Sequence, residues 1–202
     1  TVELGRYAAN AKNQGWIIYT DSEFKNPDSR KSDPKRKRQL DRFRDVITSS
    51  NAPYGLHRAR DERLFQGEKV ISLRKCVAPT FTYTDFDCYV SQTFNVIKTT
   101  RLNQQYLTGL LNSTVVAFWL RHRGKMQGHL FQVDKEPLLS IPICQPAMAQ
   151  QEVIAGVVRA VIACRRSTSE KVSQAARFEQ LVNGLIYELY FPDELNSSGI
   201  RL

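Results

Sequence analysis

The sequence predicts an α/β fold of the α+β type, in which a mixed, mostly antiparallel twisted sheet carries packed helices and is followed by an antiparallel helical hairpin. Short β-prone runs and helical stripes alternate through residues 1–144, and two longer apolar stripes of helical period fill residues 145–202. The chain has 202 residues, of which 42% are hydrophobic, enough to bury a core as one domain with an appendage or as two small domains.

The strands are predicted from β-prone runs at residues 16–19, 69–74, 80–84 and 88–97. In the last run Cys88, Val90, Phe94 and Val96 alternate with more polar side chains, so we expect one buried face and one partly polar face. The polar and basic segment 21–38 is expected to be a loop with little core of its own.

Helices are predicted where apolar side chains recur at helical spacing. A first stripe contains Leu40, Phe43, Val46 and Ile47. A second helical region covers residues 103–122 and should break at Asn112 and Ser113, because both are good N-caps. A packed helix is expected from the apolar residues that follow, Val115, Val116, Phe118 and Trp119. Residues 130–133 and 138–143 should be extended, with Pro137 and Pro142 keeping the second segment off the centre of a sheet.

The C-terminal residues are predicted to form the helical hairpin. One apolar stripe contains Val153, Ile154, Val157, Val158, Val161 and Ile162, and the other contains Phe178, Leu181, Val182, Leu185, Ile186 and Leu189. The polar stretch 165–171 links the two stripes and suits a turn between antiparallel helices. The change of pattern predicts a domain boundary between residues 144 and 145.

The positive charge of the chain is concentrated before that boundary. The formal net charge is +9, and residues 1–144 contain 23 Lys and Arg against 14 Asp and Glu, whereas residues 145–202 contain 6 against 6. A basic body followed by a neutral tail favours a localised surface for a polyanion over charge that only keeps the protein soluble.

The cysteine, histidine and hydropathy patterns argue against a zinc-binding protein and against a membrane-spanning protein. The four cysteines, Cys76, Cys88, Cys144 and Cys164, show no CxxC spacing, and three histidines complete no zinc pattern, so we expect reduced thiols and a cytoplasmic protein. No apolar run reaches the roughly 18 residues of a membrane span. The start of the chain has neither an initiator Met nor the layout of a signal peptide, and we expect a fragment of a longer protein.

A family resemblance extends over most of the sequence. It is carried by LDRFR at 40–44, LHRARDE at 56–62, Phe65, Gly67, KV at 69–70, LLNS at 110–113, FWL at 118–120, Gly124, Lys125, Gly128 and LSIPI at 139–143. From about residue 5 to residue 143 the chain resembles the C-terminal specificity domain of TaqI-like, type IIG adenine-specific DNA methyltransferases and restriction-modification enzymes. The stretch LVNGLIYELY at 181–190 resembles the helix that commonly ends these proteins.

The resemblance implies that residues 1–144 are a target recognition domain, which binds double-stranded DNA and selects the site that a separate catalytic domain methylates or cuts. Neither an Asn-Pro-Pro-Tyr type motif nor a Gly-rich loop for S-adenosylmethionine occurs in the 202 residues, so we expect that cofactor in a methyltransferase domain outside this chain. We expect no catalytic residue, cofactor or metal site here. Asp21, Glu23 and Lys25 imitate an acidic metal site only superficially, because no buried strand fixes them.

The residues expected to bind DNA are Arg58, Arg60, Arg74, Lys75, Arg121, Arg123 and Lys125. Arg121, Arg123 and Lys125 lie beside Gly124 and Gly128, which permit close approach of the backbone, and we assign them mainly to phosphates. Arg58, Arg60 and Arg74 are assigned to base edges. The alternatives are solvated ion pairs with Asp61 and Glu62 for the arginines near residue 60, and a helix C-terminus that merely favours cations for Arg121 to Lys125.

Two other functions stay open from the sequence. The hairpin suits a helical protein-interaction or spacer module of a restriction-modification complex, although the charge distribution argues against this as the main role. The second is an autonomous RNA-binding domain, but this sequence lacks the aromatic-rich strand that such domains use.

Overall fold

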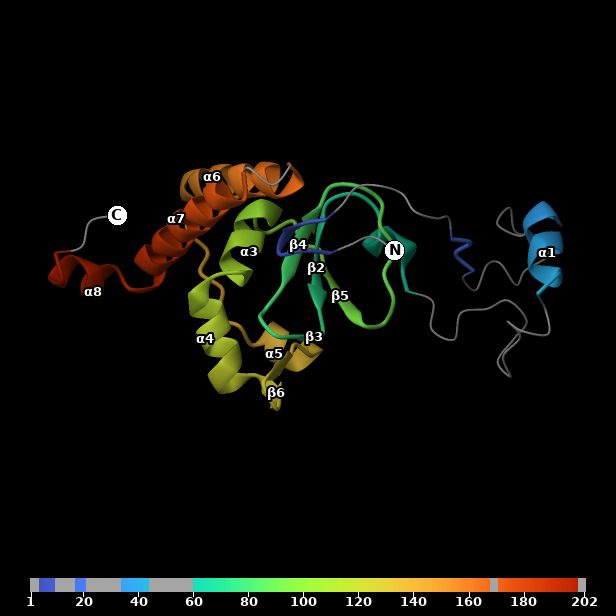
Figure 1. Ribbon diagram of the computed structural model, residues 1–202, viewed down its shortest axis with the longest axis horizontal. Coiled ribbons are helices and arrows are strands. Elements are labelled where there is room, and N and C mark those ends of the chain that lie inside the picture. The colour runs from blue at the N-terminus through green and yellow to red at the C-terminus, as the bar shows by residue number, and fades with distance from the viewer. Residues whose placement is uncertain (1–3, 10–16, 21–33, 44–59, 168–170, 200–202) are drawn as a thin grey trace. The chain divides into compact units, whose positions relative to one another are not determined.

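The computed structural model (Figure 1) describes residues 4–9, 17–20, 34–43, 60–167 and 171–199. The described residues form two compact units. The first unit contains segments 17–20, 34–43 and 60–64, and the second contains segments 4–9, 65–167 and 171–199. The predicted class is confirmed, because mostly antiparallel strands and packed helices are followed by C-terminal helices.

The first unit contains a short basic helix, α1 (Pro34–Asp41), and a 3₁₀ turn, η2 (Glu62–Leu64). The expected loop is wrong from residue 34, because Pro34 is favourable at the first helical position and long cationic side chains are good helix formers. The expected helix around Leu40 ends at Asp41, and Phe43 is 49% exposed; Val46 and Ile47 lie outside the described residues. Residues 17–19 form no strand, and Ile17 is 60% exposed, so the run gains no packing that would favour one.

The main sheet of the second unit has the strand order β1-β4-β2-β5. Its strands are β1 (Tyr7–Ala8), β2 (Lys69–Leu73), β4 (Phe81–Thr84) and β5 (Phe94–Ile97). Only β1 runs parallel to its neighbour β4, and the two other pairs are antiparallel. The strands predicted at 69–74 and 80–84 are confirmed.

The strand predicted at 88–97 is wrong over residues 88–93. The Cys88 N–H donates to the Phe65 carbonyl at 2.9 Å, and the Phe65 and Tyr89 rings stack with centroids 5.1 Å apart. The Thr93 N–H donates to the Ser91 hydroxyl at 3.4 Å and the Phe94 N–H donates to the Ser91 carbonyl at 3.2 Å, just where the ladder begins at Phe94. These local contacts satisfy the backbone before it reaches β2, so alternation alone overestimated the strand length.

Two helices, α3 (Gln104–Leu111) and α4 (Thr114–Arg123), meet at the predicted break. Asn103 caps α3 by accepting from the Gln105 and Tyr106 amides, and Ser113 caps α4 by accepting from the Val116 amide. Each cap satisfies amide groups that a helix start leaves without partners.

Asn112, between the two helices, joins them to the sheet. Its Oδ1 accepts from the Phe81 N–H at 3.1 Å, and its Nδ2 donates to the Phe81 carbonyl at 2.7 Å. The side-chain amide therefore pairs with β4 as another strand would. The Arg6 guanidinium, beside β1, donates to the Asn112 carbonyl. One buried residue thus connects α3, β4 and the start of the second unit.

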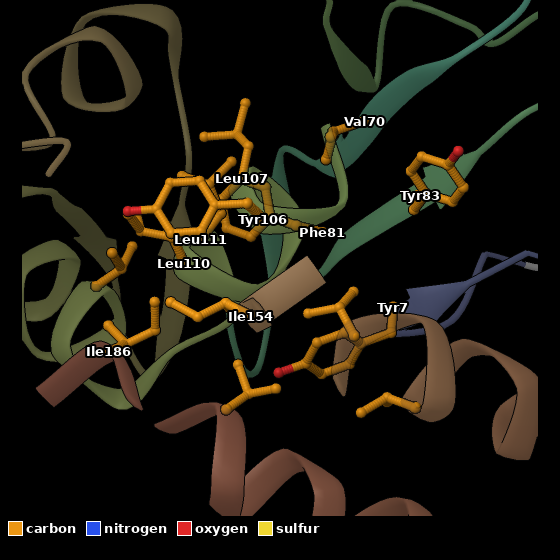
Figure 2. Packing of buried hydrophobic residues seen from close by; sticks show 14 of the residues in the cluster. Tyr7, Val70, Phe81, Tyr83, Tyr106, Leu107, Leu110, Leu111, Ile154 and Ile186 are labelled. Carbon is orange, nitrogen blue, oxygen red and sulfur yellow. The ribbon is translucent and has the colours of Figure 1, made fainter. Parts of the chain in front are cut away.

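The predicted hairpin is formed by α6 (Met148–Arg166) and α7 (Val172–Tyr190), and α8 (Pro192–Ser197) follows. Figure 2 shows Ile154 of α6 and Ile186 of α7 against the apolar side chains of α3. A Cβ on Gly109 of α3 would lie 2.7 Å from Val158 Cγ2, so glycine allows α6 to pack closely. Glu179 of α7 is buried and pairs with Arg6 at 3.2 Å and Arg165 at 2.6 Å. The core continues across residue 144, and the division at that residue stays a prediction about function.

Candidate nucleic-acid interface

A second, three-stranded sheet brings several of the expected DNA-binding residues together. It has the order β3-β7-β6 and consists of β3 (Lys75–Cys76), β6 (Lys125–Gln127) and β7 (Leu130–Gln132). We call these three strands the small sheet. In Figure 1, β3 and β6 lie near α5 and the end of α4.

The small sheet has one apolar row and one polar row. In the apolar row Phe131 pairs with Cys76 on one side and Met126 on the other, and both Phe131 and Cys76 are buried. In the next row Gln132 pairs with Lys75 and Lys125, and both lysines are exposed. Directly paired residues point to the same face and successive residues to opposite faces. The two lysines and the glutamine between them therefore share one face.

Two glycines shape the connection from α4 into this sheet. A Cβ on Gly124 would lie 2.3 Å from the Leu120 carbonyl oxygen, so only glycine allows α4 to pass directly into β6. Gly128 has a φ of 60° at the first position of the two-residue loop between β6 and β7, a site that favours glycine in a type II′ hairpin. The glycines fix where Lys125 stands relative to the end of α4.

Arg74 lies at the junction of the two sheets, between β2 and β3. Its N–H donates to the Thr93 carbonyl at 3.1 Å, and its carbonyl accepts from the Val133 N–H at 2.8 Å. The Val133 carbonyl in turn accepts from Asn95 Nδ2 at 2.8 Å. The backbone that carries the Arg74 side chain is therefore held from both sides.

Asp134, which follows β7, connects the charged residues of this region. One carboxylate oxygen accepts from Arg74 Nη2 at 2.6 Å, and the other accepts from Gln132 Nε2 at 2.6 Å. The hydrogen bond from Arg74 is the main cause that holds the pKa of Asp134 below its ordinary value, and the bond from Gln132 and the charge of Lys125 lower it further. The carboxylate stays ionised at neutral pH and can only accept hydrogen bonds.

Arg121 and Arg123 stand on the last turn of α4. The Arg121 guanidinium carbon lies 5.8 Å from the centroid of the Phe131 ring, a cation–π contact that fixes this side chain beside the apolar row. Arg123 is exposed and precedes Gly124. Both residues lie beside the small sheet on an adjoining element.

Two expectations about this region are wrong. Phe118 is 66% exposed, and its ring lies 4.3 Å from that of His122. The reason is that α4 covers the core with one side only, burying Val116 and Leu120 fully. The expected extended segment at 138–143 is instead helical up to residue 139, in α5 (Lys135–Leu139). Pro137 fits there because the first turn of a helix needs no backbone N–H partner.

The remaining expected residues belong to the first unit or lie outside the described residues. Arg58 is outside them. Arg60 is exposed in the first unit, and its carbonyl accepts from the Tyr19 hydroxyl at 2.5 Å. Arg63, a neighbour of Arg60, forms an ion pair with Asp61 at 2.7 Å. This is the kind of solvated ion pair that the sequence left open for the arginines near residue 60.

The structure also points to two residues that the sequence analysis missed, Gln132 and Asp134. Their signal in the sequence is weak: Gln132 alternates with buried Phe131 and Val133, and Asp134 is a typical N-cap residue before α5. Within the described segments, no three His, Cys, Asp or Glu side chains are grouped to hold a metal ion. The helices among these residues include none that is both long enough and apolar enough to cross a membrane.

The comparisons with known proteins agree with the resemblance. A family model described as the TaqI-like C-terminal specificity domain matches residues 5–143. The chain belongs to this family. Its members serve sequence-specific DNA recognition in restriction-modification systems, and the basic small sheet lies inside the matched region of this specificity domain. A search of curated proteins found no match.

Proposed function

We propose that this specificity domain binds duplex DNA through the polar face of the small sheet and selects the site for an adenine-N6 methyltransferase domain of the same parent protein. That catalytic domain would use S-adenosylmethionine, and the parent would be a cytoplasmic type IIG enzyme of bacterial defence. The observation that carries the proposal is the row in which Lys75 and Lys125 flank Gln132 at one register, next to Arg74.

The shape of this region suits the major groove. The groove is about 12 Å wide and admits a two-stranded β-ribbon. The hairpin of β6 and β7 is two strands wide, and β3 pairs with the other edge of β7 at Lys75 and Cys76. Neighbouring strands lie about 4.8 Å apart, so Lys75 and Lys125 stand about 10 Å apart on either side of Gln132. Lysines at the two edges can neutralise phosphates while the residues between them face the bases.

The division of labour follows from the contacts of each cation. Lys75, Lys125 and Arg123 are exposed and would bind phosphate, as flexible cations commonly do. Arg74 is held by Asp134 and by its own backbone, so its planar donors are directed and suit a base edge. Arg121 is fixed over Phe131 and would contribute charge near the groove.

The alternative role of the hairpin as an interaction module receives less support. The residues of its apolar stripes that point inward, such as Ile154, Val158, Val182 and Ile186, are already buried in the core. These residues are therefore used for folding the second unit, whereas Val153 and Leu181 of the same stripes are exposed.

Salt dependence tests the proposal directly. We expect Lys75→Ala and Lys125→Ala each to reduce the slope of log affinity against log salt by about 0.9, because each neutralised phosphate releases a condensed counterion. Binding of a random-sequence duplex by the full-length parent protein would be measured from low to moderate salt, with structured RNA as competitor.

Arg177→Ala provides the matched control, since Arg177 is an exposed cation on α7. It removes the same charge and should leave the slope unchanged. An equal effect of all three substitutions would mean that only net charge matters, and an unchanged slope for both lysine variants would place the DNA surface elsewhere. Either result would overturn the proposal.

A further inference from the structure

Asp134 occupies an unusual position for a carboxylate, in the middle of the most basic part of the second unit. It stands between Arg74 and Gln132 with both of its oxygens engaged at 2.6 Å. A carboxylate among cations that bind phosphate would weaken DNA binding by charge repulsion. Asp134 must therefore act in some way other than by attracting DNA.

The chemistry of the carboxylate determines how Gln132 is oriented. An amide side chain can present either its oxygen or its nitrogen to a neighbour, but an ionised carboxylate accepts only. Gln132 must therefore turn Nε2 toward Asp134, as it does at 2.6 Å. The amide then presents its Oε1 and its second N–H away from Asp134, as an acceptor beside a donor.

The same carboxylate directs Arg74. The Nη2 group donates to Asp134 at 2.6 Å and the Nη1 group donates to the Gln92 carbonyl at 3.3 Å. A guanidinium has five N–H donors and no acceptor, so donors remain for a ligand. Because the Arg74 backbone is bonded to Thr93 and Val133, the side chain is fixed at both of its ends.

Resting on the proposed function, we propose that Asp134 is a positioning residue that presets Arg74 to bind guanine and Gln132 to bind adenine. Guanine offers two acceptors in the major groove, O6 and N7, which match the paired donors of an arginine. Adenine offers the N7 acceptor beside the N6 donor, which matches an amide whose oxygen and second N–H both point outward. The recognition sequence therefore contains a guanine and an adenine whose selection depends on Asp134.

The test is a selection of duplexes from a random library by the full-length parent protein, followed by sequencing of the bound fraction. Asp134→Asn is close in shape but lets Gln132 turn over and removes the charged partner of Arg74. We expect the preference for one guanine and one adenine to fall about ten-fold or more, a loss of the size that one bidentate base contact provides. Preferences at the other positions should stay unchanged.

Two further variants assign the positions to residues. Gln132→Ala should remove the adenine preference alone, and Arg74→Lys, which keeps the charge but loses the planar fork, should remove the guanine preference alone. Loss at one position is a result that a merely structural role of these residues would not produce.

Asp85→Asn is the matched control for the change of charge. Asp85 follows β4, pairs with Arg166 at 3.4 Å, and lies near the Lys69 end of β2, whereas Arg74 follows the opposite end of that strand. It should leave every base preference intact. The inference is overturned if Asp134→Asn keeps the wild-type preferences, or if both Asp variants lower all preferences equally. If the wild-type protein enriches no sequence, the proposed function fails together with the inference.

Discussion

The small sheet and the hairpin contribute to the same core but leave different surfaces in solvent. Phe131 of the small sheet and Ile186 of the hairpin belong to one buried cluster. The exposed row of the small sheet carries Lys75 and Lys125, whereas residues 145–202 balance 6 cations with 6 anions. Net charge alone therefore does not locate a binding surface. The fold creates the basic surface by placing Lys75 and Lys125 in one row.

Helix α4 connects the two regions. Its first N–H, from Thr114, donates to Asn183 Oδ1 of α7 at 2.9 Å, and its last residue precedes Gly124 and Lys125 of β6. A ten-residue helix spans about 15 Å. The hairpin therefore supports the start of a rigid element whose other end carries the basic surface.

The largest effect is expected from a charge placed where the hairpin enters the core. Ile186→Asp puts an unpaired carboxylate at a fully buried position and should cost more than about 4 kcal/mol, so that the second unit no longer folds. Leu181→Asp on the same helix is the control, because Leu181 is 44% exposed and the change there should cost far less. Thermal unfolding followed by circular dichroism measures both, and equal melting temperatures would contradict the description of the hairpin as core.

A smaller loss is expected at the joint between α3 and β4. Asn112→Ala leaves the Phe81 N–H and carbonyl without their side-chain partner, and two buried polar groups without partners cost about 2 to 6 kcal/mol. Asn183→Ala removes a more exposed bond to Thr114 and should cost about 1 kcal/mol. Urea unfolding compares the two variants. A loss at Asn183 as large as that at Asn112 would show that the joint adds nothing beyond a cap.

The buried tyrosines of the second unit predict a stability loss in alkali. Burial raises the pKa of Tyr106, whose hydroxyl donates to the Cys144 carbonyl at 2.8 Å. Because the folded pKa lies above the unfolded value of about 10, the stability is fully present below pH 10 and is lost as pH rises above it. Urea midpoints from pH 8 to pH 11 should fall in this direction, and Tyr106→Phe should make the fall shallower. A parallel fall in the variant would assign it to other groups.

The smallest effect on stability is expected on the exposed row of the small sheet. Lys75→Ala combined with Lys125→Ala should change the free energy of unfolding by no more than about 0.5 kcal/mol, because surface substitutions away from special features rarely cost more. Thermal unfolding measures this, beside the salt slope of the same double variant. A large destabilisation would mean that the lysine stems hold the sheet together.

Local patterns predicted much of this fold correctly. The break between α3 and α4 and the Ser113 cap were predicted, and the period of the hairpin stripes identified α6 and α7. These features depend on residues close together in the chain. By contrast, the expected N-cap at Asn112 is wrong, because Asn112 ends α3 and its side chain pairs with β4. The true partner of Asn112 is Phe81, which lies 31 residues away. The local structural preferences of residues cannot predict a hydrogen bond between residues so far apart in the sequence.

The candidate site was less predictable for the same reason. Lys75 and Lys125 were expected to bind DNA, but their common register depends on β7, which pairs with segments far apart in the sequence. Asp134 was missed because an acidic residue in a basic region normally counts against anion binding. The proposal for Asp134 depends on the two hydrogen bonds that its oxygens accept from Arg74 and Gln132, and neither bond can be read from the sequence.

The alternation of outward and inward side chains in the small sheet has a consequence for how the protein can evolve. Positions 75, 125 and 132 face solvent, while positions 76, 126 and 131 alternate with them toward the core. A point mutation in the outward row changes the chemistry offered to a ligand and leaves the inward row as it was. Under the proposed role of this row, a single substitution there would alter the recognised sequence while the inward row keeps its packing.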